Sequence, residues 1–435
     1  MLRSNTEERV RKAEGLLGRL KKIRKFSGKY QIAPVREAKQ VALEMQELAS
    51  SLEEIPKPKN QDELIQSELK RRMNGEATYL EQGLSGRLYD FDTVIGLLGI
   101  PRKDIDSLRP WLEQNKEKTQ DAIERLFHSR DIEGFELPLA EDVPSIRRQA
   151  EEFSSAHIQR YHKTLGKFLQ GITNVGEFIR DINAVASTNE RSYFQPLTNT
   201  LAIGIPAICY STEDCTLHIK DREMIRLYGH EGMGHALNYM VTRSNSLPHF
   251  LTEDSALTVA TAESVALHYE NILLEDLRKS PETQRRLGIE HKFAGIYQEA
   301  KDTEQVGEYK RRLAYYSISV LSDKSLGEQQ DPATLNRKVQ RINEVAIDPS
   351  QAMGFVQSNR YNFDSEGNLN SSIVGELRYC ARPVPRAIDE FSKKGIDYFG
   401  EGRSLIDSTM LKGLWTPIGF VDNARLVAEE YSSKK

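Results

Sequence analysis

Apolar residues recur at intervals of three and four along most of this chain, and that spacing is the strongest constraint on its fold. Such spacing places apolar side chains on one face of an α-helix. Similar patterns run from about residue 61 to 81, from 103 to 128, and from 221 almost to the end. The clearest run, with polar residues between its members, consists of Ala38, Val41, Ala42, Met45, Leu48, Ala49 and Leu52. We therefore predict a mainly α-helical protein.

One interval has the composition of β-strands instead. Residues 192–219 include an Ile-rich stretch, residues 201–210, which Pro206 interrupts. Because proline cannot donate a hydrogen bond to a sheet, we expect edge strands here rather than a central one. The sequence thus predicts a small antiparallel β-sheet near the helix that carries the chemistry. Residues 200–210 are the candidate strand along which an extended peptide substrate would pair.

Charge and composition exclude several classes of protein. The 435 residues include 60 Lys and Arg against 64 Asp and Glu, a formal net charge of −4, so a nucleic-acid partner is not expected. No stretch approaches the roughly 18 apolar residues of a membrane span, and the first residues lack the apolar core of a secretion signal. The three cysteines form no CxxC pair. We expect a soluble, cytoplasmic protein with no membrane partner.

Proline-rich breaks near residues 135–145 suggest a division of the chain. We predict an N-terminal helical region, residues 1–145, followed by a region that carries the chemistry, residues 146–435. The sequence does not indicate the oligomeric state.

The residues that carry chemistry are His230-Glu231-Gly232-Met233-Gly234-His235. Two histidines can hold a zinc ion, and an adjacent glutamate can act as the general base that activates water. The usual spacing in such sites is His-Glu-x-x-His, four apart on one helix face. Here the histidines are five apart, which on an ideal helix separates them by about 140°. We therefore predict a local π-type distortion, which Gly232 and Gly234 would make tolerable.

A third ligand is expected from the next helix, because three protein ligands leave the fourth position of a catalytic zinc open. Glu263 and Glu270 are seven residues apart on an otherwise apolar stripe. Two buried carboxylates need partners, which a metal, a histidine N–H or an arginine can supply. We predict that Glu263 is a zinc ligand. Glu270 is predicted to orient another ligand by contacting it, without binding the metal itself. An exchange of these two roles, and a purely structural role for both histidines, remain alternatives.

The same residues resemble gluzincin metallopeptidases. The stretch from His230 to Leu237 is similar to the His-Glu-x-Gly-His-Ala-Leu of the carboxypeptidase Taq and thimet oligopeptidase families, with one residue added. The added residue is similar to the His-Glu-x-x-Gly-His of dipeptidyl peptidase III. Ala262-Glu263-Ser264 and Tyr269-Glu270-Asn271 resemble the glutamate helix of the carboxypeptidase Taq family. The resemblance implies a Zn²⁺ cofactor with Glu263 as a ligand, a helical gluzincin body with a deep cleft, and short peptides as substrates.

Two C-terminal stretches, residues 371–378 and 404–417, resemble a poorly characterised bacterial family of helical zinc-peptidase-like proteins. In that family we expect a tyrosine where Ser372 stands and a histidine where Ile406 stands. These departures concern the groups that stabilise the transition state rather than the metal site.

The residues that would stabilise the tetrahedral oxyanion are harder to assign. Tyr361 and Tyr379 are the preferred candidates, ahead of Arg378 and His268, and packing of each tyrosine for its ring alone is the alternative. Arg378, Arg382 and Arg386 recur every four residues. Arg378 and Arg382 are candidates to bind a substrate's C-terminal carboxylate, which would make the enzyme a carboxypeptidase, and surface salt bridges are the alternative.

The leading hypothesis from sequence is thus a zinc metallopeptidase, with Glu231 as general base. A non-catalytic helical scaffold that retains a zinc-peptidase fold is the first alternative. A metal-dependent hydrolase of non-peptide amides is the second.

Overall fold

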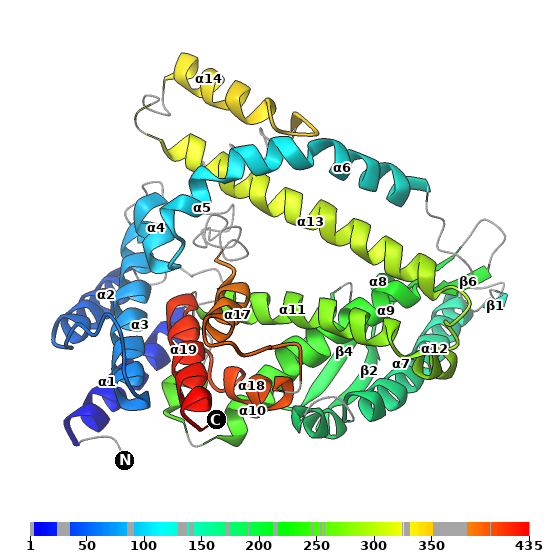
Figure 1. Cartoon of the computed structure of the whole chain (residues 1–435), viewed down its shortest axis with the longest axis horizontal. Coiled ribbons are helices and arrows are strands. Elements are labelled where there is room, and N and C mark those ends of the chain that lie inside the picture. Colours follow the sequence, from blue (N-terminus) through cyan, green and yellow to red (C-terminus); the bar gives the residue numbers. More distant parts are fainter. Residues whose placement is uncertain are drawn as a thin grey trace.

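The computed structural model describes residues 4–23, 35–84, 91–128, 137–138, 143–170, 174–189, 191–211, 216–245, 247–252, 255, 257–323, 325, 331–350, 381–400 and 402–434. Within these residues the fold is mainly helical, as predicted (Figure 1). The helices of the first part are α1 (Ser4–Ile23), α2 (Val35–Ser50), α3 (Gln61–Leu84), α4 (Phe91–Leu97), α5 (Arg102–Asp106), α6 (Leu108–His128), α7 (Val143–Gln170) and the 3₁₀ helix η1 (Asn174–Asp181).

The second part contains the longest helix and the segment with the two histidines. Its helices are α8 (Ile205–Ile208), α9 (Asp221–Leu227), the π-helix η2 (Tyr228–Ala236), α10 (Leu237–Ser244), the 3₁₀ helix η3 (His249–Thr252), α11 (Thr258–Arg278), α12 (Pro281–Leu287), α13 (Phe293–Ser322), α14 (Pro332–Asn343), α17 (Pro383–Lys393), α18 (Arg403–Met410) and α19 (Pro417–Lys434). The apolar stripe of α2 is buried as its spacing predicts, with Val41, Ala42 and Met45 fully covered.

The strands form two small sheets of three strands each. One is antiparallel, with the order β1 (Leu137–Pro138), β6 (Thr216–Ile219), β5 (Cys209–Ser211). The other has the order β2 (Asn183–Ser187), β4 (Thr200–Gly204), β3 (Tyr193–Gln195). In it β4 pairs with β2 in parallel and with β3 antiparallel, so that Phe194 lies opposite Leu201.

Two predictions about the strands hold for the antiparallel sheet, in which β5 lies at the edge, but not for the sheet beside the histidine-bearing helix. The sheet beside the histidine-bearing helix is mixed rather than antiparallel, because β2 pairs along the far side of β4. Strand β4 is central rather than an edge strand, and Leu201, Ala202 and Ile203 are buried. It ends before Pro206, which lies in the first turn of the short helix α8, where a missing N–H costs nothing. Since β4 is paired on both sides, residues 200–204 cannot pair with a substrate.

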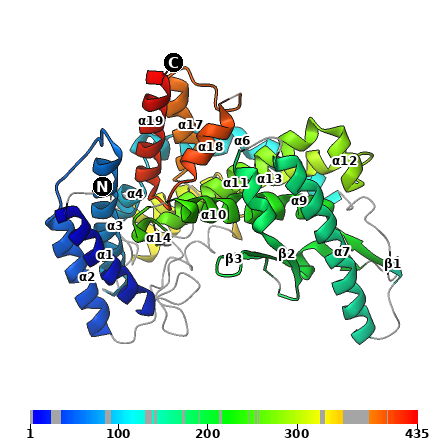
Figure 2. The same cartoon turned by 90° about the horizontal axis from the view of Figure 1, so that it is seen from below.

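The elements around the histidines are stacked in layers. The mixed sheet packs on one side of η2 through β3 and β4, and α11 packs on the other side. Beyond α11 lie α17 and α19. Figure 2 shows this order, with β2 and β3 on one side of the central helices and α17 to α19 on the opposite side. The histidine-bearing segment is therefore held between a sheet and a long helix.

The two predicted regions are in extensive contact. Helix α6 packs along α13, and α3 packs against α19. One connected cluster of buried apolar side chains extends from Val10 to Ala428. The boundary between residues 145 and 146 stays a prediction, but helices on its two sides share a core. None of the described helices combines the length and the apolar character needed to cross a lipid bilayer.

Candidate metal centre

The segment that carries both histidines is wound as a π-helix. It spans nine residues, Tyr228–Ala236, and continues directly from α9 into α10. In a π-helix the hydrogen bonds join residues five apart, so positions five apart lie about one turn from each other. His230 and His235 therefore return to the same side of the helix. This confirms the predicted π-type distortion, which extends over the whole motif rather than a single turn.

Glycines let this segment approach α11 closely. A Cβ atom on Gly234 would overlap the backbone of Ala266, and one on Gly229 would lie 2.9 Å from the Cα of Glu270. A Cβ on Gly232 would meet only the side chains of Leu201 and Tyr228, at 3.4 Å or more. The close contact between the two helices thus requires glycine at position 234. This is a second reason for a glycine there, in addition to the predicted distortion of the helix.

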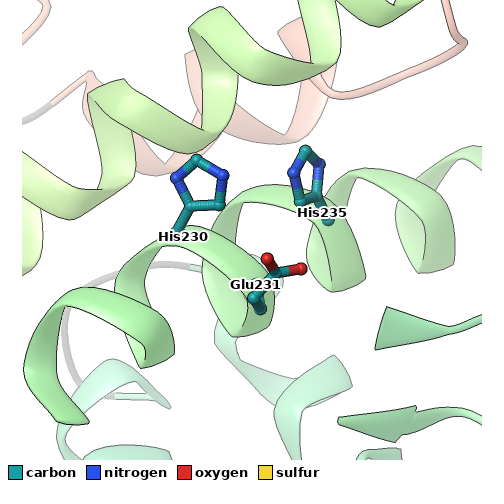
Figure 3. A group of neighbouring side chains, drawn as sticks. All are labelled: His230, Glu231 and His235. Atoms are coloured by element: carbon teal, nitrogen blue, oxygen red, sulfur yellow. The ribbon is translucent and has the colours of Figure 1, made fainter. Parts of the chain in front are cut away.

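His230, Glu231 and His235 form a compact group. Each offers a ligand atom, and these atoms all lie within 4.8 Å of one another. The two imidazole rings have centroids 5.0 Å apart and are nearly perpendicular, at 82°. Figure 3 shows the rings projecting side by side from the same side of the helix, with the Glu231 carboxylate below and between them. The two rings do not diverge, so one ion can contact both.

Helix α11 places two carboxylates, those of Glu263 and Glu270, beside the ring of His230. The Nε2 atom of His230 lies 3.5 Å from Oε2 of Glu263, and its Nδ1 donates a 3.0 Å hydrogen bond to Oε2 of Glu270. Glu270 is also 3.8 Å from the guanidinium of Arg226 on α9. All three side chains that meet here, His230, Glu263 and Glu270, are less than 20% exposed. The partners that the sequence required for two carboxylates on an apolar stripe are present.

The buried charges perturb one another. Burial by itself would lower the pKa of His230, but hydrogen bonds from its ring to Glu263 and Glu270 raise that pKa to about 9. Burial raises the pKa of Glu231 to about 7; the neighbouring Glu263 adds to this, while His230 and Arg226 oppose it. A backbone hydrogen bond from Phe194 on β3 also favours the charged form of Glu231. Three carboxylates thus surround one histidine, which is an environment that favours a cation.

The donor set fits zinc. Two imidazoles and one carboxylate are a common ligand set for catalytic zinc, and two ligands of a tetrahedral zinc ion lie about 3.3 Å apart. The 3.5 Å separation of His230 Nε2 and Glu263 is close to that value. The hydrogen bond from Nδ1 to Glu270 is the kind of contact that orients a metal-bound histidine. Glu231 is a second carboxylate within reach, and it is the one whose oxygen lies within 4.8 Å of both imidazoles.

Tyr361, Tyr379, Arg378 and Ser372 are outside the described residues. Arg382 forms its ion pair with Glu308 of α13, at 3.4 Å.

Two further positions do not bear on the metal group directly. His268 is half-buried, with its Nε2 3.1 Å from the hydroxyl of Tyr398, which favours the structural role over the oxyanion role. Ile406, where the resemblance leads us to expect a histidine, is buried in α18.

Sequence reasoning missed three contributors to the site. Arg226 lies four residues before His230, a spacing that places two side chains on one face of a helix. Both side chains lie beside Glu270. Gly229 precedes the motif and carries no signal of its own. Phe194 acts through its backbone, which no side-chain pattern reveals.

Comparisons of this chain with protein-family models, with curated proteins and with solved structures find no match.

Proposed function

We propose that this protein is a zinc-dependent metallopeptidase of the gluzincin type that hydrolyses short peptides within a cleft of its helical body. The observation that carries this proposal is the convergence of two histidines, five residues apart, on one side of a π-helix against the carboxylates of α11. A helix wound as an ordinary α-helix would not bring these rings together.

Each residue of the site has a proposed role. His230, His235 and Glu263 hold the metal, and Glu270 orients His230 through Nδ1. Zinc, when bound, supplies a Lewis acid and lowers the pKa of a water molecule to near 7. Glu231, between the two rings, takes a proton from the attacking water and returns it to the leaving amine. Its position next to both imidazoles supports this assignment.

The edge of the mixed sheet supports a peptide as the substrate. Among the described strands, β3 pairs with β4 on one side only, and its Phe194 backbone bonds to the general base Glu231. An extended peptide can add to such an edge, with its scissile carbonyl near the metal. Tyr193 of β3 and Leu197, which follows it, are exposed apolar side chains, 41% and 88%, that would contact substrate side chains.

Metal content and turnover together test the proposal. The purified protein should contain about one zinc per chain when measured by inductively coupled plasma mass spectrometry, and a His230→Ala/His235→Ala variant should contain none. Glu231→Gln should keep the metal and lose hydrolysis by a factor of at least about 100. Unchanged peptide hydrolysis in Glu231→Gln would contradict the mechanism.

The same variants separate the alternatives. Glu263→Ala should lose zinc, whereas retention of zinc in Glu263→Ala together with its loss in Glu231→Gln would exchange the two glutamates. Zinc binding without hydrolysis of any peptide would favour the scaffold or the non-peptide hydrolase. A panel of blocked and free-ended peptides, read by mass spectrometry, distinguishes a carboxypeptidase from an endopeptidase.

A further inference from the structure

A pocket of about 380 Å³ lies between the start of α6, the middle of α13 and the start of α17. Four arginines from two of these helix regions line it: Arg311 and Arg312 from α13, and Arg382 and Arg386 from the start of α17. Its volume is within the range of small-molecule sites, about 300–1,000 Å³. Arg382 is also the residue that the sequence offers for a substrate's C-terminal carboxylate, but none of the roles proposed for the metal group uses this pocket.

The arginines share one carboxylate. Glu308 accepts hydrogen bonds from Arg312 Nε at 2.7 Å and from Arg311 Nη2 at 3.2 Å, and its carboxylate lies 3.4 Å from Arg382 Nη1. Burial would raise the pKa of Glu308, but the charges of Arg382, Arg312 and Arg311 lower it, so it is ionised.

In the described lining of the pocket, three carboxylates face the four guanidinium groups, and Glu308 is the least exposed of the three. The two other acidic residues that line the pocket, Asp104 and Asp389, are both exposed. Arg382 is also exposed, at 48%, and Asp104 opposes the lowering by burial of the pKa of Arg386. The described lining therefore carries one more positive than negative charge.

Two of the guanidinium groups, those of Arg312 and Arg386, are held in place by contacts other than Glu308. Arg312 lies flat against Trp111, with its Cζ 4.2 Å from the ring centroid. Arg386 donates from Nη1 to the carbonyl of Gly99 at 2.5 Å. Arg382 has a left-handed backbone, φ 43° and ψ 48°, a strained conformation for a residue with a side chain.

We propose that this arginine pocket binds a small organic dianion, whose phosphate or carboxylate groups are held by the guanidinium forks of Arg311, Arg312 and Arg382. Guanidinium groups match the geometry of both oxyanions and bind them through paired hydrogen bonds. The volume exceeds that of a single oxyanion, which leaves room for the organic part of the ligand.

The pocket is a neighbour of the metal centre but is built from different residues. The backbone N–H of Val384, in the first turn of α17, donates to Oγ of Ser264, which directly follows Glu263 on α11. Anion binding here does not require the metal, so it stands or falls independently of the proposed peptidase function.

Isothermal titration of the full chain tests the proposal, with sodium phosphate and sodium succinate as separate probes at constant ionic strength. We expect saturable binding of at least one probe in the wild type. Arg382→Gln and Arg311→Gln should each weaken it at least tenfold. Arg382→Lys keeps the charge but loses the fork, and should lie between wild type and Arg382→Gln.

Two controls make the test specific. Arg286→Gln removes an exposed arginine of α12 that pairs with Glu282, and should bind as the wild type does. The His230→Ala/His235→Ala variant should also bind normally, which separates this pocket from anion binding at a metal. Absence of saturable binding in the wild type, or equal binding in Arg382→Gln and the wild type, would overturn the proposal and leave a structural salt-bridge cluster.

Discussion

His230 is bonded through both ring nitrogens to carboxylates of a single helix. Nδ1 donates to Glu270, whose other oxygen faces Arg226, while Nε2 faces Glu263. Because Nδ1 is occupied by a hydrogen-bond acceptor, Nε2 is the nitrogen left to bind a cation. Glu270, which lies beside Arg226, thus orients the ring. Nε2 of His230 and the carboxylate of Glu263 are the atoms that can bind a cation.

Removal of the orienting carboxylate should weaken metal binding without abolishing it. We expect Glu270→Ala to lower zinc affinity roughly 10- to 100-fold, because His230 loses the contact that orients its ring. Glu270→Gln keeps an acceptor oxygen and should lose less. Competition with a chromophoric chelator measures the affinity.

Glu275→Ala is the matched control, since Glu275 is on the same helix but bonds to Tyr297. Equal zinc affinities for Glu270→Ala and Glu275→Ala would show that Glu270 does not orient the site.

At the level of elements, the site depends on how closely two helices approach. The π-helix η2 presents its glycines to α11, and Gly229 and Gly234 meet the backbone of Glu270 and Ala266. The distance between the histidines and the two carboxylates of α11 is therefore set by residues without side chains. A larger residue at this contact would push the ligands apart.

Two glycines of the motif should respond differently to the same substitution. Gly234→Ala places a methyl group against the backbone of Ala266, so we expect a loss of about 1–3 kcal/mol in stability and a clear loss of zinc. Gly232→Ala meets only side chains, and its effect on stability should stay within about 1 kcal/mol.

Thermal unfolding and metal analysis of both variants measure these effects. If Gly234→Ala retains both stability and zinc as Gly232→Ala does, the close approach of η2 and α11 is not what positions the ligands.

Across the whole molecule, a buried charged group ties the first helices to the last. Glu68 on α3 is fully buried and accepts hydrogen bonds from the backbone N–H and the hydroxyl of Thr416, both at 2.7 Å. It also accepts one from Arg72, which in turn donates to the carbonyl of Phe250 in η3. The N-terminal helices are thus bonded to the segment before α19 and to the segment before α11.

Removal of this carboxylate should destabilise the protein strongly. We expect Glu68→Ala to cost about 3–5 kcal/mol, because the Nε of Arg72 and the N–H and hydroxyl of Thr416 all lose a buried, charged acceptor. Asp62→Ala, at an exposed position of the same helix, is the control and should change little. Urea unfolding followed by circular dichroism measures both. Similar midpoints for the two variants would mean that the buried bonds of Glu68 contribute little.

The sequence predicted correctly those features that depend on residues close together along the chain. The spacing of apolar residues identified the helices, since one buried face is enough to stabilise an amphipathic segment. The pairing of the strands could not be predicted in the same way. The parallel partner of β4 is β2, which comes before the hairpin of β3 and β4, and no local pattern indicates that pairing. Pro206, taken as a break within a strand, instead lies in the first turn of a short helix.

The sequence by itself determined the helical class, the candidate ligands His230, His235 and Glu263, and the need for a π-helix, because a five-residue spacing and two glycines are local properties. Only the tertiary structure decided which surfaces meet. The approach of α11 to η2, the contact of Arg226 with Glu270, and the burial of Glu68 against Thr416 all join residues distant along the chain. Such contacts depend on the packing of whole helices, and no single segment specifies that packing.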